Sequence, residues 1–268
     1  MTSSAVKNMV LLTDFGSRDL YAGVLKGVIR GICPLAVMTD LTHGVEPQNI
    51  LQGAMILEDA FRYFPPGTVF LCVVDPGVGT SRKAIAVRTS HYFFVGPDNG
   101  LLSLAARTER RVQIRLIKNR RYLRAKGKIS ATFHGRDIFA PAAAHIAADP
   151  ANFDKLGPRL KSLTPADVPR IRRDARGLSG VITAFDHYGN ALTNIRIADI
   201  APKLRKSGIV RVNHHSVGPL IRTYGHASSR LIALINSFDR LEIAFPNGSA
   251  QLRGGLSLHD PVSIRYEA

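Results

Sequence analysis

The sequence of 268 residues contains no tryptophan and only two cysteines, Cys33 and Cys72. Each cysteine lies within an apolar run, which is typical of buried thiols and argues against a disulfide framework. The longest apolar runs, such as residues 69–74, are of strand length and far shorter than the roughly 18 residues of a membrane span. The first eight residues, MTSSAVKN, lack the basic start and apolar core of a secretory signal. These absences favour a cytoplasmic protein with no membrane partner.

Acidic residues are also scarce, because 20 Asp and Glu stand against 36 Lys and Arg, a formal net charge of +16. The excess is concentrated in residues 107–177, whose net charge is +12, whereas residues 1–106 are neutral. A basic segment of this kind can bind nucleic acid. It lacks the interleaved aromatic residues that stack on bases, however, and contains no nucleic-acid-binding motif. We therefore interpret it as a solvated arginine-rich face and do not expect a nucleic-acid partner.

The pattern of the first 150 residues alternates strand-like and helix-like segments, which predicts an α/β domain with a mainly parallel sheet. Strands are expected over residues 9–13, 36–41 and 68–74, and helices over residues 21–32, 47–63 and 137–148. Asp19 is expected to cap the first helix. From about residue 177 the chain consists of short strand-like segments separated by Gly, Pro and Asn, which predicts a smaller all-β domain. We place the domains at residues 1–170 and 171–268.

Charged residues follow the predicted strands at their carboxyl ends, where ligands gather in open α/β sheets. The loop DPGVGTSR carries Asp75 and Arg82 and contains two glycines, but it lacks the Lys-Ser/Thr ending of a phosphate-binding P-loop. His134 lies in FHGRD, directly before a predicted helix, where functional loop residues are common. Taken singly, the Asp75–Arg82 loop is best explained as a surface turn with an ordinary ion pair. His134 alone is as compatible with a hydrogen bond at a helix entry as with a catalytic role.

Seven segments of the chain, taken together and in their order, are far more specific than any one of them alone. They are LLTDFGSRDLYAGVLKG, DLTHGVEPQNI, FPPGTVFLCVVDPGVGTSR, VGPDNGLLS, FHGRDIFAPAAA, DHYGNALTNI and INSFDRLEIAFPNGSA. In this order they resemble the S-adenosyl-L-methionine (SAM) hydrolases, also called SAM hydroxide adenosyltransferases, which are relatives of the bacterial fluorinase and chlorinase. The resemblance implies an N-terminal α/β domain, a C-terminal barrel-like domain, SAM as the substrate, and a homotrimer with sites at its subunit interfaces. It implies neither a metal nor a cofactor.

The resemblance also implies a catalytic trio, which falls here on Asp75, Arg82 and His134. The reaction would be attack of an activated water at C5′ of SAM, which yields adenosine and L-methionine. A permanently charged guanidinium suits the stabilisation of a developing hydroxide. The proton of the water could pass to His134 or to Asp75, and the sequence leaves both open.

Substrate contacts are implied in the same way. Asp14 would accept the two ribose hydroxyls, Asn190 would meet the adenine edge, and Asp186 would pair with the methionine ammonium. A hairpin turn is the plain alternative for the segment that holds Asp186 and Asn190.

Three further residues, Asn236, Ser237 and Ala250, are implied to contact the amino-acid end or the adenine. The chain carries Phe238 where the halogenating relatives carry an arginine, which leaves the partner of the methionine carboxylate open.

Two other functions are weighed against the hydrolase. A SAM-dependent halogenase would share the fold but, by resemblance, lacks the Asp-Arg-His trio. A non-catalytic protein that binds SAM or nucleic acid is suggested only by the basic segment.

Overall fold

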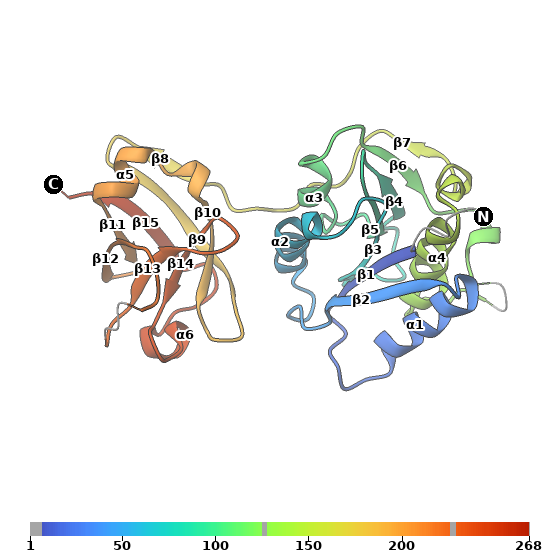
Figure 1. The fold of residues 1–268 in the computed structure, drawn as a ribbon, viewed down its shortest axis with the longest axis horizontal. Coiled ribbons are helices and arrows are strands. Elements are labelled where there is room, and N and C mark those ends of the chain that lie inside the picture. The colour runs from blue at the N-terminus through green and yellow to red at the C-terminus, as the bar shows by residue number, and fades with distance from the viewer. Residues whose placement is uncertain (1–6, 125–127, 226–228, 268) are drawn as a thin grey trace. The chain divides into compact units, whose positions relative to one another are not determined.

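The computed structural model describes residues 7–124, 128–225 and 229–267. The chain divides into two compact units, Met1–Asp167 and Val168–Ala268 (Figure 1). This division falls close to the boundary expected between residues 170 and 171. The first six residues, which carry most of the segment used for the targeting prediction, lie outside the described residues.

The first unit is built on a seven-stranded sheet with the strand order β2-β1-β3-β5-β4-β6-β7. Its strands are β1 (Lys7–Thr13), β2 (Ala36–Thr42), β3 (Val69–Val73), β4 (Ala84–Arg88), β5 (Phe93–Pro97), β6 (Gln113–Leu116) and β7 (Arg159–Leu160). The α/β class is confirmed, but the sheet is mixed. Strands β2, β1, β3 and β5 are parallel, whereas β4, β6 and β7 are joined in antiparallel fashion. The link between β4 and β5 is too short for the crossover that parallel pairing requires, so these two strands form a hairpin.

Helices cover both faces of this sheet (Figure 1). On one face lie α1 (Tyr21–Ile32) and α4 (Ala140–Ala148), and on the other lie α2 (Ile50–Ala60) and α3 (Ser103–Arg107). Strand β1 is buried on both sides, and successive side chains of a strand point to opposite faces. Met9 and Leu11 therefore enter one core, while Val10 and Leu12 enter the other. This double burial explains the continuous apolar run in the sequence.

The helix boundaries differ from the prediction in three places. The predicted helix over 47–63 begins at Ile50, because the Asn49 side chain accepts a hydrogen bond from the amide of Gln52, and it ends in a 3-10 turn, η1 (Phe61–Tyr63). The predicted cap at Asp19 is wrong, since the residue before α1 is Leu20 and no side chain caps the helix. The predicted helix over 137–148 is α-helical only from Ala140, because its first three residues belong to a π-helical turn, η3 (Gly135–Phe139). Two further 3-10 turns are η2 (Arg120–Tyr122) and η4 (Pro150–Lys155).

The second unit is a β-barrel, as the family resemblance implies. Its strands are β8 (Arg172–Asp174), β9 (Gly177–Phe185), β10 (Ala191–Arg196), β11 (Gly208–Val212), β12 (His215–Ile221), β13 (Ile232–Ile235), β14 (Arg240–Ala244) and β15 (Pro261–Tyr266). The order β10-β14-β13-β12-β11-β15-β9-β8 closes through a pairing of β10 with β9, which leaves β8 outside the ring. Short helical segments, η5 (Ile197–Asp199), α5 (Pro202–Ser207) and α6 (Ala250–Gly254), interrupt the strands.

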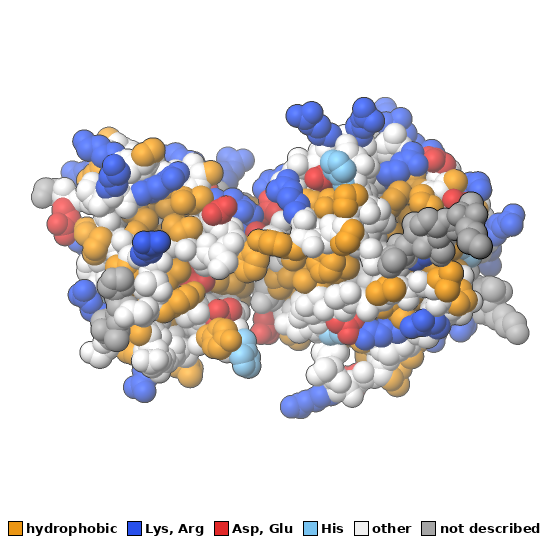
Figure 2. All heavy atoms as spheres, in the orientation of Figure 1, with side chains coloured by type: hydrophobic (Ala, Val, Ile, Leu, Met, Phe, Trp, Pro, Cys, Tyr) orange, Lys and Arg blue, Asp and Glu red, His pale blue; other side chains and the backbone are white. Residues whose placement is uncertain are grey.

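Basic side chains on the visible face in Figure 2 are separated by acidic, polar and hydrophobic ones. In the first unit, one arginine of the basic segment, Arg115, contacts the carboxylate of Asp154, which also pairs with Arg88 outside the segment. Among the described residues, no helix has the length and apolar character needed to cross a membrane. Cys33 and Cys72 are both buried and free.

Candidate active site

The loop after β3 carries a buried ion pair between Asp75 and Arg82. Arg82 Nε donates to Asp75 Oδ1 at 2.8 Å, and Arg82 Nη2 donates to Oδ2 of the same carboxylate. The two side chains are only 6% and 10% exposed. The guanidinium also lies over the ring of Phe139, with its carbon 5.0 Å from the ring centroid. A two-pronged, buried pair of this kind is held in one geometry, because both guanidinium bonds must be made at once.

His134 completes the group, since Arg82 Nη2 lies 2.8 Å from His134 Nδ1. A guanidinium can only donate, so Nδ1 must accept and the proton of the neutral ring resides on Nε2. The pKa of His134 is lowered, first by burial and then by the positive charge of Arg82. The arrangement therefore favours a neutral imidazole that offers an N–H at Nε2.

A glycine allows the Asp75–Arg82 loop to touch the segment before His134. Gly79 has a φ of +79°, in the left-handed region that favours glycine. A β-carbon at this position would lie 2.4 Å from the carbonyl oxygen of Ala131. A larger residue would therefore separate the loop from the segment that carries His134.

A buried carboxylate, Asp137, anchors the same segment from the other side. Its side chain is fully buried, accepts a hydrogen bond from the amide of Ser130 at 2.8 Å, and pairs with Arg136 and Arg124. Burial alone would raise the pKa of Asp137, but the bonds from Arg136 and Ser130 and the two positive charges together lower it. The carboxylate thus ties together the elements on both sides of His134.

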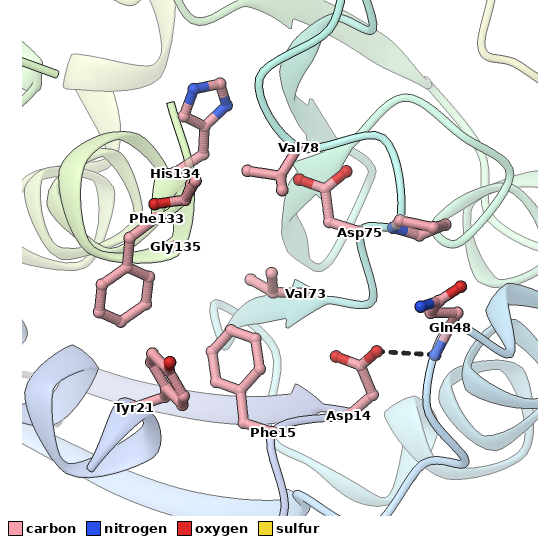
Figure 3. A pocket seen from close by; sticks show the side chains of 12 residues that line it. Asp14, Phe15, Tyr21, Gln48, Val73, Asp75, Val78, Phe133, His134 and Gly135 are labelled. Carbon is pink, nitrogen blue, oxygen red and sulfur yellow. Dashed lines mark hydrogen bonds between the residues drawn. The ribbon is translucent and has the colours of Figure 1, made fainter. Parts of the chain in front are cut away.

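Asp75 and His134 line a cavity of about 310 Å³ (Figure 3), and Arg82 bonds both of them from outside the lining. Asp14, Gln48, Asp75 and His134 supply polar groups to its lining. An aromatic cluster of Phe15, Tyr21 and Phe133 forms an apolar part of the lining, with ring centroids 5.2 to 6.2 Å apart. A concave site with an apolar wall and a few convergent polar groups is the usual form of a small-molecule site.

Asp14 reaches this cavity because it follows β1 directly. Its Oδ2 accepts a hydrogen bond from the backbone amide of Gln48 at 2.9 Å. The preceding residue, Thr13, is fully buried and its hydroxyl lies 2.8 Å from His43 Nδ1. The ends of β1, β2 and β3 are therefore brought together, as the strand-end argument predicts.

A second cavity, of about 660 Å³, lies within the barrel unit. Asp186 and Asn190 line it, together with aromatic and loop residues, namely Tyr188, Tyr224, Phe245, Pro246, Asn247, Gly248 and Ser249. Asp186 organises the turn, since it accepts hydrogen bonds from the amides of Tyr188 and Asn190 and from the Asn190 side chain. The Asn190 side-chain oxygen is not used in these bonds, which leaves it as an acceptor for a ligand.

The remaining predicted contacts lie near this cavity but are not in its lining. Asn236 Nδ2 donates to Glu242 at 3.1 Å, Ser237 is exposed on the turn between β13 and β14, and Ala250 is buried at the start of α6. Glu242 also accepts the Tyr224 hydroxyl at 2.6 Å, and burial raises the pKa of this carboxyl. The roles of Asn236, Ser237 and Ala250 stay predictions.

Several lining residues were missed by the sequence reasoning. Phe15 and Phe133 are next to the predicted site residues Asp14 and His134, and Tyr21 begins a predicted helix. These positions in the sequence could have identified them as lining residues. Gln48 and Tyr224 have no such signal in the sequence. The position of Gln48 depends on its backbone geometry, and that of Tyr224 depends on its hydrogen bond to the buried Glu242. Within residues 7–124, 128–225 and 229–267, no three His, Cys, Asp or Glu side chains gather as a metal site would require.

The fold and the site define a class of two-domain proteins in which an α/β domain carries a charged Asp-Arg-His group beside a cavity and a barrel follows it. The sequence matches the SAM hydroxide adenosyltransferase N-terminal domain over residues 9–157 and the C-terminal domain of the same family over residues 180–263. The chain therefore belongs to the SAM hydroxide adenosyltransferase family.

Curated relatives agree along almost the whole chain. It is 36% identical over 266 residues to the (R)-S-adenosyl-L-methionine hydrolase of Thermus thermophilus, which covers 97% of this chain and 100% of the relative. The hydrolase of the same name from Methanocaldococcus jannaschii is 33% identical, over 96% of this chain and 95% of the relative. A fluorinase from an Actinoplanes species is more distant, with 28% identity over 75% of this chain and 74% of the relative.

Solved structures share the fold. A crystal structure of an uncharacterised conserved protein from Thermotoga maritima superposes with a TM-score of 0.87 and 37% identity, over 96% of this chain and 99% of that chain. A conserved hypothetical protein from Thermus thermophilus gives a TM-score of 0.77 and 33% identity, with the same coverage.

Proposed function

We propose that the protein hydrolyses SAM to adenosine and L-methionine. The observation that carries this proposal is the Asp75–Arg82–His134 group at the edge of a cavity that also holds the Asp14 carboxylate. Three relatives named as hydrolases support it at 33 to 36% identity over nearly their full length. Their names specify the R configuration at the sulfonium, and we assign the same epimer to this chain.

The chemistry requires an activated nucleophile and little else. The sulfonium leaves as a neutral thioether when C5′ is attacked, so no acid is needed at sulfur. Water is a poor nucleophile, with a pKa of about 15.7 in bulk. We propose that Arg82 stabilises the developing hydroxide and that His134 Nε2–H holds the water oxygen in line with the C5′–S bond. Asp75 then takes the proton of the water. The choice of Asp75 rests on the tautomer, since His134 Nδ1 already accepts from Arg82.

Binding of the substrate is assigned to both units. Asp14 accepts the ribose hydroxyls, Asn190 meets the adenine, and Asp186 pairs with the ammonium of the methionyl group. We further propose, on the resemblance alone, a homotrimer that completes each site at a subunit interface.

Heavy-oxygen water tests the reaction directly. The protein is incubated with the R and S epimers of SAM in H₂¹⁸O, and the adenosine is analysed by mass spectrometry. We expect adenosine from the R epimer with the label at the 5′ oxygen, because water attacks C5′. Formation of halogenated nucleoside in the presence of chloride or fluoride would instead favour the halogenase, and unlabelled adenosine would contradict attack by water.

The pH profile tests the state of His134. Protonation would place a hydrogen on Nδ1 and break its contact with Arg82, so the neutral ring is the active form. Because the pKa of His134 lies below its ordinary 6.5, kcat/KM should be full at pH 7 and fall at acid pH with a midpoint below 6.5. A His134→Gln variant should lose this acid limb. A midpoint above 6.5 in the wild-type protein would contradict the assigned tautomer.

A further inference from the structure

Gln48 has an unusual backbone at the edge of the first cavity. Its φ is +66°, in the left-handed region that residues with a β-carbon rarely adopt. The conformation is fixed by its surroundings, because the Gln48 carbonyl accepts from the amide of Ile50 and the next residue, Asn49, caps α2. Strained residues that the surrounding structure holds in place cluster at ligand sites.

This backbone conformation has a direct consequence for Asp14. It turns the Gln48 amide toward the carboxylate, to which it donates at 2.9 Å. Figure 3 shows this bond and places the Gln48 side chain beside Asp14 at the cavity. The two residues therefore form one unit of the lining, although they are far apart in the sequence.

The side chain of Gln48 is available for a ligand. It lines the cavity and is exposed, and within the described part of the chain its carboxamide makes no hydrogen bond. A carboxamide offers one acceptor and two donors. Asp14 and Asp75 line the same cavity and repel an anion, so a neutral partner fits this position better than a carboxylate.

A vicinal diol fits both residues at once. Each sugar hydroxyl carries one proton and two lone pairs. A carboxylate such as Asp14 can take the protons, but it cannot satisfy the lone pairs. A neighbouring N–H donor supplies what the carboxylate lacks.

We propose that Gln48 is a substrate-binding residue. Its side-chain amide donates a hydrogen bond to a ribose hydroxyl whose own proton is donated to Asp14, so that the pair selects a ribonucleoside over a deoxynucleoside. The inference rests on the proposed function, since it takes the ribose of SAM as the group beside Asp14.

The test compares adenosine with its 2′-deoxy and 3′-deoxy analogues by isothermal titration calorimetry on the full chain. The Gln48→Gly variant keeps the backbone amide and suits a positive φ, and it removes only the carboxamide. We expect it to weaken adenosine binding about five-fold, the effect of one neutral hydrogen bond, and to leave unchanged the affinity for the analogue that lacks the contacted hydroxyl. In turnover, KM should rise more than kcat falls. Gln48→Glu, of the same size but without donors and beside Asp14, should weaken adenosine binding more than the glycine variant does.

Equal losses for adenosine and both deoxy analogues in the glycine variant, or no loss at all, would overturn the role of Gln48. A loss for free methionine in place of adenosine would also overturn it, because the amide would then serve the amino-acid end. Failure of the wild-type protein to form adenosine from SAM would instead overturn the proposed function itself.

Discussion

Replacing Arg82 by alanine is expected to lower kcat for SAM hydrolysis about 1,000-fold, the upper range for the loss of one oxyanion-stabilising donor. The change removes the charge assigned to the developing hydroxide, leaves the buried Asp75 carboxylate without its cation, and frees His134 from its fixed tautomer. The measurement is single-turnover formation of adenosine, with binding of SAM followed separately. Arg82→Lys should recover only part of the rate, because an ammonium cannot bond both carboxylate oxygens and the imidazole in one plane.

Arg88 provides a matched control for this variant. It also bonds a carboxylate through two nitrogens, that of Asp154, and its guanidinium lies 4.5 Å from the centroid of the Phe153 ring. Its partners are Asp154, Gln113 and Phe153, none of which lines the cavity or belongs to the Asp75–Arg82–His134 group. Arg88→Ala should therefore leave kcat within about two-fold of the wild-type value, since surface ion pairs contribute little. Comparable losses in the two alanine variants would show that the effect of Arg82 is a general loss of structure.

Replacing Asp137 by asparagine is expected to lower the free energy of unfolding by about 3 kcal/mol, toward the lower end for breaking a buried ion pair. The carboxylate is fully buried, whereas its partners Arg124 and Arg136 are about a third exposed and can regain water. The measurement is urea unfolding at pH 7. Because the pKa of Asp137 is lowered in the folded protein, its contribution is present at neutral pH and is lost as the pH falls through that value. The difference between wild type and variant should shrink accordingly in acid.

The control is Asp154→Asn, which also removes a carboxylate shared by two arginines. Its side chain is 45% exposed, so the loss should stay below about 1 kcal/mol. Equal destabilisation by the two variants would contradict the importance of burial at Asp137.

The α/β-plus-barrel architecture could be predicted because local patterns and resemblance agree with it. The apolar run of β3 and the turn-rich second half need no knowledge of distant contacts. The mixed sheet could not be foreseen in the same way, since the direction of β4 depends on the short link to β5. The cap at Asp19 failed because capping depends on the backbone geometry of Leu20, which the residue types do not reveal.

The proposed catalytic trio was named from resemblance, and the structure brings Asp75, Arg82 and His134 into contact. What the sequence could not reveal is the direction of each hydrogen bond, and hence the tautomer of the imidazole. Gln48 was missed for a related reason. A positive φ at a residue other than glycine is set by the surrounding chain and leaves no trace in composition or spacing.

The close approach of Gly79 to the Ala131 carbonyl means that two stretches of backbone meet without an intervening side chain. Such a close contact restricts the relative motion of the two stretches. The Asp75 carboxylate and the Arg82 guanidinium on one stretch therefore keep their positions relative to the His134 imidazole on the other. In the proposed reaction, charge that develops on the attacking oxygen would meet dipoles that are already oriented, and little free energy would be spent in reorienting them.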